Sequence, residues 1–344
     1  MISRSVGFSA AAAAALLAMD ATAFAQGANP VYRNKQIRMV IASGAGGGYD
    51  AYARILSRYL EKYIPGNPTI VNQNMPGASG MQAMNWAYAA APKDGTVILA
   101  TYNALLAEPL YGNPAVQYDT LKFEMIGSYS KQQNICVTWH TSPIKTIKHA
   151  QEREVIVSST GATGNSATMP KILNAVLGTK FKLVLGYGTT EARLAVERGE
   201  AEGICGLSWS TLKASNPDWV QNKRINILVQ TGAKPQADLP DVPVLLDLVA
   251  NADDKKVVSF LSFPEEMGRP FVMPPGTPKA MVEAVRQGFD AALKDAQLKE
   301  ESDKQMLEVD PVSGPEMERI LNDAYALPKD LIKRAAQLSG VETK

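Results

Sequence analysis

The stretch VIASGAGGGYDAYARI, residues 40–55, joins an apolar run to a helical pattern through a cluster of glycines. The apolar run at 37–42 is typical of a short buried strand, and apolar residues recur at helical spacing after Asp50. Glycine loses much backbone entropy on folding, so this density indicates a loop that needs positive φ or close approach to a ligand. A strand–loop–helix of this kind presents backbone N–H groups and the positive end of a helix dipole, which suit an anion.

Strands and helices alternate on both sides of the middle of the chain. After the opening unit, strand candidates follow near 69–72 and in KDGTVILAT; a second set begins at 132–140 and ends at 224–232. Such alternation predicts mostly parallel sheets covered by helices on both faces. Because 344 residues exceed what one core usually holds, we expect two α/β lobes.

Glycine loops before helices recur along the chain. They occur in MPGASG at 75–80, in SSTGATGNS at 158–166 and in YGTT at 187–190. In open α/β sheets such loops gather at the carboxyl ends of the strands, where ligands bind. With two lobes, the expected site is the cleft between them.

Three interpretations of the first loop stay open at this point. Gly46-x-Gly48-x-x-Ala51 loosely matches a dinucleotide fingerprint, but the second strand ends in Val71-Asn72-Gln73-Asn74, without an acid for a ribose hydroxyl. A tight turn with no ligand explains a single glycine loop equally well. A carboxylate, which needs only two or three N–H donors, fits the loop better than a nucleotide does.

Composition and motifs argue against several classes of function. The net charge is +1 and no basic run carries interleaved aromatics, which disfavours nucleic acid as a partner. His140 and His149 are the only histidines, and the chain has no HExxH, CxxC or GxSxG motif. We therefore expect a binding protein with no cofactor and no metal, rather than an enzyme.

The N-terminus has the pattern of a secretory signal. Arg4 precedes a short apolar stretch, and Ala23-Phe24-Ala25 has the small-x-small form of a cleavage site. We expect residues 1–25 to be a signal peptide cut before Gln26, and a soluble mature protein in the periplasm or outside the cell.

Together, these motifs resemble the solute receptors of tripartite tricarboxylate transporters, the Bordetella uptake gene family. The resemblance rests on the first loop, on the N-x-P-G-A-x-G of 74–80, on P-x-D-G-T at 92–96, and on STGATGNSATMPKIL, LPDVPVL and PPGTPKAMVEAV in order. It implies a type II periplasmic-binding fold, with lobe 1 formed by 27–128 and 256–344 and lobe 2 by 129–255. It also implies capture of a small carboxylate, a di- or tricarboxylate or an aromatic acid, by a monomeric "Venus flytrap" receptor that serves membrane subunits.

In that family the first-lobe loop binds a carboxylate through backbone N–H groups and a serine-rich loop of the second lobe faces it. This chain lacks the proline common in the first loop, where Ala42-Ser43-Gly44 stands, and has Met169-Pro170 where His-Leu is usual. The predicted contacts come from both lobes and from the strand ends beside them. They are Ala45, Gly46, Gly47, Gly48, Tyr49, Asp50, Asn103, Ser159, Thr160, Gly161, Thr163, Asn165, Ser166, Tyr187, Gly188, Thr189, Ser208 and Trp209.

The resemblance also bears on the two cysteines. In the type II strand order the segment NICVTWH lies beside EGICGLSW, which brings Cys136 near Cys205. We expect the pair to be bonded or within bonding reach, with Cα atoms less than about 7 Å apart.

Two other functions use the same scaffold and stay open: a secreted enzyme, and an accessory protein that presents a ligand to a membrane sensor.

Overall fold

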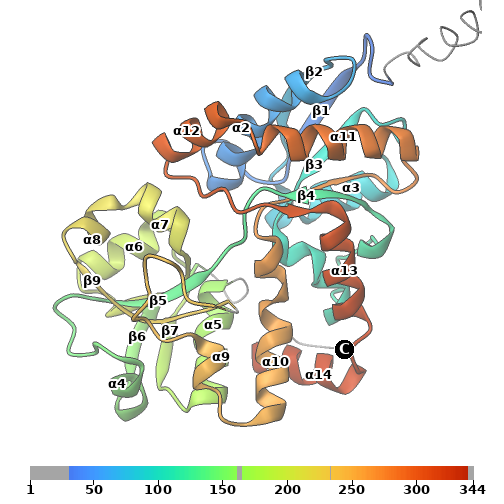
Figure 1. Cartoon of the computed structure of the whole chain (residues 1–344). Helices are drawn as coiled ribbons and strands as arrows, with labels where there is room; N and C mark the ends of the chain where they lie inside the picture. The colour runs from blue at the N-terminus through green and yellow to red at the C-terminus, as the bar shows by residue number, and fades with distance from the viewer. Residues whose placement is uncertain (1–30, 161–164, 233, 340–344) are drawn as a thin grey trace, which may run out of the picture.

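The computed structural model describes residues 31–160, 165–232 and 234–339, apart from the side chain of Thr189. The signal peptide expected at 1–25 lies outside these residues. The described chain folds into two bodies, each built on one β-sheet with helices around it (Figure 1). The two-lobed α/β fold expected from the alternating pattern is confirmed.

The first lobe is built on a mixed sheet with the strand order β11-β4-β10-β3-β1-β2. β1 pairs in parallel with β2 and β3, whereas β10 runs antiparallel between β3 and β4 because it enters the sheet after the chain has returned from the second lobe. Parallel pairing is thus limited to the N-terminal strands. The strands are β1 Gln36–Ile41, β2 Thr69–Asn74, β3 Val97–Ala100, β4 Glu124–Ser128, β10 Pro270–Met273 and β11 Val312–Ser313.

The second lobe has a sheet with the order β7-β6-β8-β5-β9. β6 pairs in parallel with β7 and β8, and β5, the strand that arrives from the first lobe, runs antiparallel to β8 and β9. Both sheets are therefore mixed, with the antiparallel strands next to the crossings. The strands are β5 Asn134–Trp139, β6 Val155–Ser158, β7 Phe181–Val184, β8 Gly203–Ser208 and β9 Ile225–Gln230.

Both faces of each sheet are buried by helices. Along β1, Met39 and Ile41 enter one apolar cluster and Val40 enters another, which is the alternation expected of a strand covered on both sides. The helices are α2 Gly48–Tyr63, α3 Met81–Ala89, α4 Ile147–Glu152, α5 Asn165–Leu177, α6 Thr189–Glu197, α7 Trp209–Ser215, α8 Pro217–Gln221, α9 Leu245–Leu248, α10 Ala252–Ser262, α11 Lys279–Ala292, α12 Ala296–Lys304, α13 Gly314–Tyr325 and α14 Lys329–Ser339. Short 3₁₀ helices occur at η2 Gly77–Gly80, η3 Asn103–Leu106, η4 Glu108–Tyr111, η5 Thr120–Lys122 and η6 Phe263–Met267.

Helix α10 belongs to the interiors of both lobes. Val257 and Phe260 lie in an apolar cluster of the first lobe, while Val258 lies in a cluster of the second. In Figure 1 α10 runs between the second lobe and α13, and α14 packs across α10 and α5. The lobe boundary at 255/256 falls inside α10 and stays a prediction, since the two lobes share this helix.

Within the described ranges, no helix is both long and apolar enough to cross a lipid bilayer.

Candidate ligand-binding site

The glycine loop after β1 is exposed at the start of α2. Residues 44–47 are all exposed, and a Cβ added at Gly44 or Gly46 would have no atom within 4 Å. Gly46 has a φ of +80°, in the left-handed region that glycine adopts without strain. The loop is therefore open to a ligand and is shaped by at least one obligatory glycine.

Asp50 holds the loop in place from inside. Its Oδ2 accepts the Gly46 N–H at 2.9 Å and the Arg54 Nε–H at 2.8 Å, and its Oδ1 accepts Asn74 Nδ2–H at 2.8 Å. Burial by itself would raise the pKa of Asp50, but the hydrogen bonds from Arg54, Gly46 and Asn74 outweigh it and lower that pKa. Since Asp50 is 3% exposed and both its carboxylate oxygens accept hydrogen bonds, its side chain shapes the loop, and a direct contact with a ligand stays a prediction.

The backbone donors that remain are those of the first turn of α2. Gly47 is the N-cap residue, with extended backbone, and no side chain caps the helix. The amides of the first turn have no acceptor within an α-helix, and the helix dipole adds positive potential there. Because Gly46 donates to Asp50, Gly47, Gly48 and Tyr49 supply the N–H groups best placed for a carboxylate.

Tyr49 and Asn103 form a fixed pair beside this turn. The Tyr49 hydroxyl donates to the Gly268 carbonyl at 3.0 Å and lies 3.1 Å from Asn103 Oδ1. Asn103 is buried, and its Nδ2–H donates to the Pro264 carbonyl at 3.0 Å. Asn103 thus positions Tyr49, and the polar atoms of both side chains already have partners.

The second-lobe serines gather at the end of β6. Ser166 Oγ lies 3.1 Å from Ser159 Oγ and 3.0 Å from Thr160 Oγ1, and it accepts the Thr160 N–H at 3.2 Å. Asn165 begins α5 immediately before this serine. Ser159, Thr160, Asn165 and Ser166 are therefore brought together as predicted, while Gly161 and Thr163 lie outside the described residues.

The third loop lies next to these serines. The Tyr187 N–H donates to the Ser159 carbonyl at 3.3 Å, and Gly188 is the N-cap of α6. A Cβ at Gly188 would overlap the Glu191 carboxylate, so an acidic group already occupies the first turn of this helix. Of Thr189 only the backbone is described. An anion is less favoured at α6 than at α2 because of Glu191.

Ser208 and Trp209 have different environments. Trp209 is 2% exposed, and its indole N–H donates to Asp238 at 2.9 Å, so it packs in the second lobe and offers no surface to a ligand. The prediction of Trp209 as a ligand contact is therefore not supported. Ser208 is the N-cap of α7 and accepts the Thr211 N–H at 3.4 Å.

Helix α7 meets the first-lobe loop across the lobe junction. A side chain at Gly48 would begin 3.6 Å from Thr211 Oγ1, which places the start of α2 against the first turn of α7. Arg269, which comes just before β10, also lies at this junction. Its Nη2 donates to Thr211 Oγ1 at 3.2 Å, and its guanidinium carbon is 4.5 Å from the centre of the Tyr49 ring. Sequence reasoning missed Arg269; its only signal is a single cation at the start of an apolar strand, in GRPFVM.

Cys136 and Cys205 face each other across β5 and β8. Their Cα atoms are 3.8 Å apart and the structure joins their sulfurs as a disulfide. Both residues are fully buried in the core of the second lobe.

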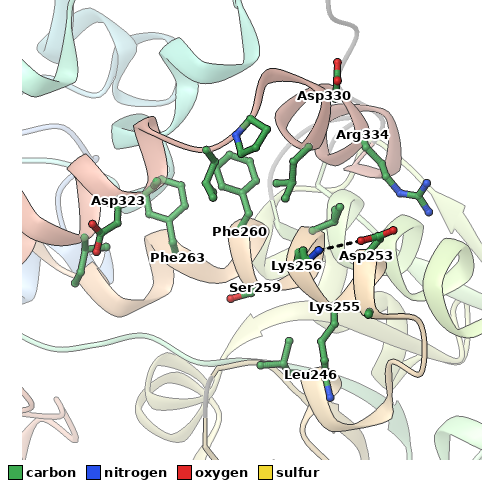
Figure 2. Close-up of a pocket in the computed structure, with 17 residues that line it drawn as sticks. Leu246, Asp253, Lys255, Lys256, Ser259, Phe260, Phe263, Asp323, Asp330 and Arg334 are labelled. Carbon is green, nitrogen blue, oxygen red and sulfur yellow. Dashed lines mark hydrogen bonds and ion pairs between the residues drawn. The ribbon is translucent and has the colours of Figure 1, made fainter.

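Two cavities in the described part of the chain differ in their relation to the site. One, of about 1020 Å³, is lined by α10, α13 and α14 (Figure 2) and includes none of the predicted contacts. The other, only about 50 Å³, lies between the lobes and is lined by Asn165 together with Asn134 and Glu265. The described residues contain no cluster of histidine, cysteine and acidic side chains suited to a metal ion.

Two mixed sheets joined by chain crossings, with glycine loops at the ends of the strands, form the arrangement of the two-lobed solute-binding class. Residues 53–337 match the family described as the tripartite tricarboxylate transporter family receptor. The chain therefore belongs to that family of receptors, which are not enzymes. A UPF0065 protein of Bordetella bronchiseptica is 26% identical over 225 residues, which covers 63% of this chain and 64%, less than two thirds, of that protein.

Solved structures of similar fold agree with this assignment. A TctC solute-binding protein from Polaromonas has a TM-score of 0.68 at 19% identity, over 88% of this chain and 99% of that one. MatC of Rhodopseudomonas palustris with bound malate has a TM-score of 0.64 at 17% identity, covering 89% and 99%. A second R. palustris protein, with adipate, has a TM-score of 0.67 at 18% identity, covering 89% and 98%. At these identities the likeness concerns the fold.

Proposed function

We propose that this chain is a periplasmic receptor that captures a small carboxylate between its lobes and delivers it to the membrane subunits of a tripartite transporter. The observation that carries the proposal is the exposed loop 44–47, which leads into the first turn of α2, where Gly48 approaches Thr211 of the other lobe across the junction. Membership of the receptor family and the malate and adipate of two structural relatives support the same class of ligand.

The carboxylate is bound mainly by the backbone. One ligand oxygen accepts from the amides of Gly47 and Gly48, where the dipole of the 16-residue helix α2 adds positive potential. The Ser159–Ser166 hydroxyl cluster of the second lobe supplies donors for the far part of the ligand. Closing the lobes excludes water and strengthens these bonds.

Delivery and location belong to the same proposal. The signal pattern in residues 1–25 fits export, and a monomer with one cleft per chain is sufficient for hand-over to membrane subunits. A receptor of this kind returns its ligand chemically unchanged.

The test is direct identification of the ligand followed by a loop variant. Native mass spectrometry of freshly purified protein should reveal a bound acid, and calorimetry with malate, adipate and the acid found should give a dissociation constant near the micromolar range. Gly47→Val should weaken binding at least tenfold without unfolding the protein, because the Gly47 backbone is extended and only the Gly44 carbonyl lies nearby, at 3.5 Å.

Gly44→Ala is the matched control, since it adds a methyl group to the same exposed loop before the helix amides. Unchanged affinity in Gly47→Val, with the native protein binding the acid, would place the ligand elsewhere.

A further inference from the structure

Arg269 is a buried cation held between the two lobes. It is 3% exposed, although it lies where α7 of the second lobe meets α2 of the first. Its guanidinium carbon lies 4.5 Å from the centre of the Tyr49 ring and 5.0 Å from that of Tyr52, so two aromatic faces of α2 contact it. Cation–π contact of this kind fixes the plane of the guanidinium.

The donors of Arg269 are unevenly used. Nη1 donates to the Gln132 side-chain oxygen and to the Gly268 carbonyl. Among the described residues, Nη2 has two hydroxyl partners at the start of α7: Thr211 Oγ1 at 3.2 Å, and Oγ of the N-cap residue Ser208 at 3.4 Å. Nε is buried and has no hydrogen-bond partner within the described ranges.

Among the residues that the structure describes, no carboxylate forms an ion pair with this guanidinium. Glu308 interacts with this charge only through space, so the cation has no directly bonded anion. A buried cation without a paired anion is unfavourable, and so is a buried N–H without an acceptor. The Nε–H and one Nη2–H lie parallel on the same edge of the guanidinium, in the spacing that a carboxylate accepts with both oxygens. The edge of Arg269 that lacks good partners is thus the edge built to take a carboxylate.

Arg269 lies next to the helix turn that is proposed to bind the ligand. Tyr49, which stacks on the guanidinium, is in the first turn of α2, and Gly48 of the same turn approaches Thr211. A short diacid could place one carboxylate on the amides of that turn and the other on Arg269. The second carboxylate would then replace Ser208 and Thr211 as the partner of Nη2.

We propose that Arg269 is a specificity-determining residue that binds the second carboxylate of a dicarboxylate ligand through its Nε and Nη2. This inference rests on the proposed function and adds to it a preference for diacids over monoacids. Arg269 stays in contact with the lobe junction whether the ligand is present or absent, because Gln132 and Gly268 hold Nη1.

The test compares two diacids, malate and adipate, with their half-amides, in which one carboxylate is replaced by a neutral group of similar size. In the native protein the half-amide should bind about 30-fold more weakly than the diacid, the loss expected when a buried charge pair loses one partner. Arg269→Gln should weaken the diacid by a similar factor and leave the half-amide within about threefold of its affinity for the native protein, because the interaction is already gone.

Arg193→Gln is the matched control. Arg193 also has a buried Nε without a partner, but it lies on α6 and is bonded to Ser215, within the second lobe. This variant should keep the native ratio of diacid to half-amide affinity. If Arg269→Gln does not fold, Arg269→Lys is the second variant, because it preserves the charge. Its ratio of diacid to half-amide affinity should be reduced but measurable, since lysine lacks the two-donor edge of arginine.

The outcomes separate the two proposals. Equal diacid affinity in Arg269→Gln and the native protein overturns the inference and leaves the proposed function standing. An equal loss of diacid and half-amide in that variant shows a purely structural role, and it also overturns the inference. If the native protein binds neither diacid, the proposed function fails for this class and the inference fails with it.

Discussion

Asp50 Oδ2 accepts the backbone N–H of Gly46 at 2.9 Å, so an acid at the start of α2 closes the glycine loop on itself. The side-chain carboxylate of Asp50 thus accepts one of the backbone N–H groups of a loop that resembles an anion site. The remaining amides of the first turn have no acceptor within the helix. The Asp50 carboxylate preorganises the loop, and this lowers the entropy cost of binding the carboxylate of a ligand.

Replacing Asp50 should release the loop. Asp50→Asn removes the charge and turns one acceptor into a donor that faces Arg54 or Asn74, so we expect a loss of about 1–3 kcal/mol in the free energy of unfolding at pH 7. Urea denaturation measures this loss. Arg54→Gln, which removes the half-exposed partner, should cost less.

The same loss should depend on pH. The folded-state pKa of Asp50 is lowered, so its stabilisation is present above the usual carboxyl pKa of 3.8 and disappears as pH falls through the folded value. The difference between native protein and Asp50→Asn should therefore shrink when the denaturation is repeated in acid. A difference that stays constant down to pH 3 would contradict this role.

Glu265, at the junction between the lobes, should make the stability of the folded protein depend on pH in the opposite direction. Burial raises the pKa of Glu265 to about 7, despite hydrogen bonds from Thr231 at 2.5 Å and Asn134 at 2.6 Å. The folded state keeps this proton up to a higher pH than the unfolded chain does, so stability falls as pH rises from about 4.5 to about 7. The full shift corresponds to about 3 kcal/mol.

Thermal unfolding of the native protein and of Glu265→Gln between pH 5 and pH 8 measures this effect. The variant should lose less stability over that range because its amide does not titrate. Glu266→Gln should stay close to the native curve, because the charge of Glu266 is the smallest of the causes that shift the pKa of Glu265. Parallel curves for the native protein and Glu265→Gln would show that this carboxyl does not titrate in the range.

Because Cys136 and Cys205 are joined by a disulfide, we expect the stability of the second lobe to depend on redox conditions. A bond between residues 69 positions apart restricts the unfolded chain, and the loop-entropy relation gives about 4 kcal/mol for this length. Dithiothreitol should lower the melting temperature of the native protein and leave the double variant Cys136→Ala, Cys205→Ala unchanged. Two titratable thiols in the unreduced, unfolded protein would show that the cysteines are free.

The sequence predicts the scaffold well because its signals are local. The strand expected at 37–42 is β1 Gln36–Ile41, and the helix after Asp50 is α2, since apolar spacing and glycine density act over a few residues. The strand expected at 224–232 is β9 Ile225–Gln230 for the same reason.

The roles of individual side chains are less predictable because they depend on distant partners. Asp50 is bound by Asn74, 24 residues away, and Trp209 by Asp238, 29 residues away. Arg269 meets Thr211 only because two lobes close on each other. No pattern within one segment could distinguish these roles from ligand contact.

Gly206 offers a test of how closely β8 must approach the second-lobe loop. It has a φ of +70°, and a Cβ there would overlap the carbonyl of Asn165, the first residue of α5. Gly206→Ala should therefore displace the start of α5 and the Ser166 hydroxyl next to it, weakening ligand binding as well as stability.

Gly178→Ala is the matched control for the backbone strain alone, because Gly178 has a φ of +69° and open space around it. We expect about 1 kcal/mol of destabilisation for Gly178→Ala and about 1–3 kcal/mol more for Gly206→Ala, from forced overpacking. Urea denaturation of both variants, with calorimetry on the ligand, measures the two effects. If both variants lose the same stability and bind alike, β8 does not restrain the start of α5, and the second-lobe serines are positioned by other contacts.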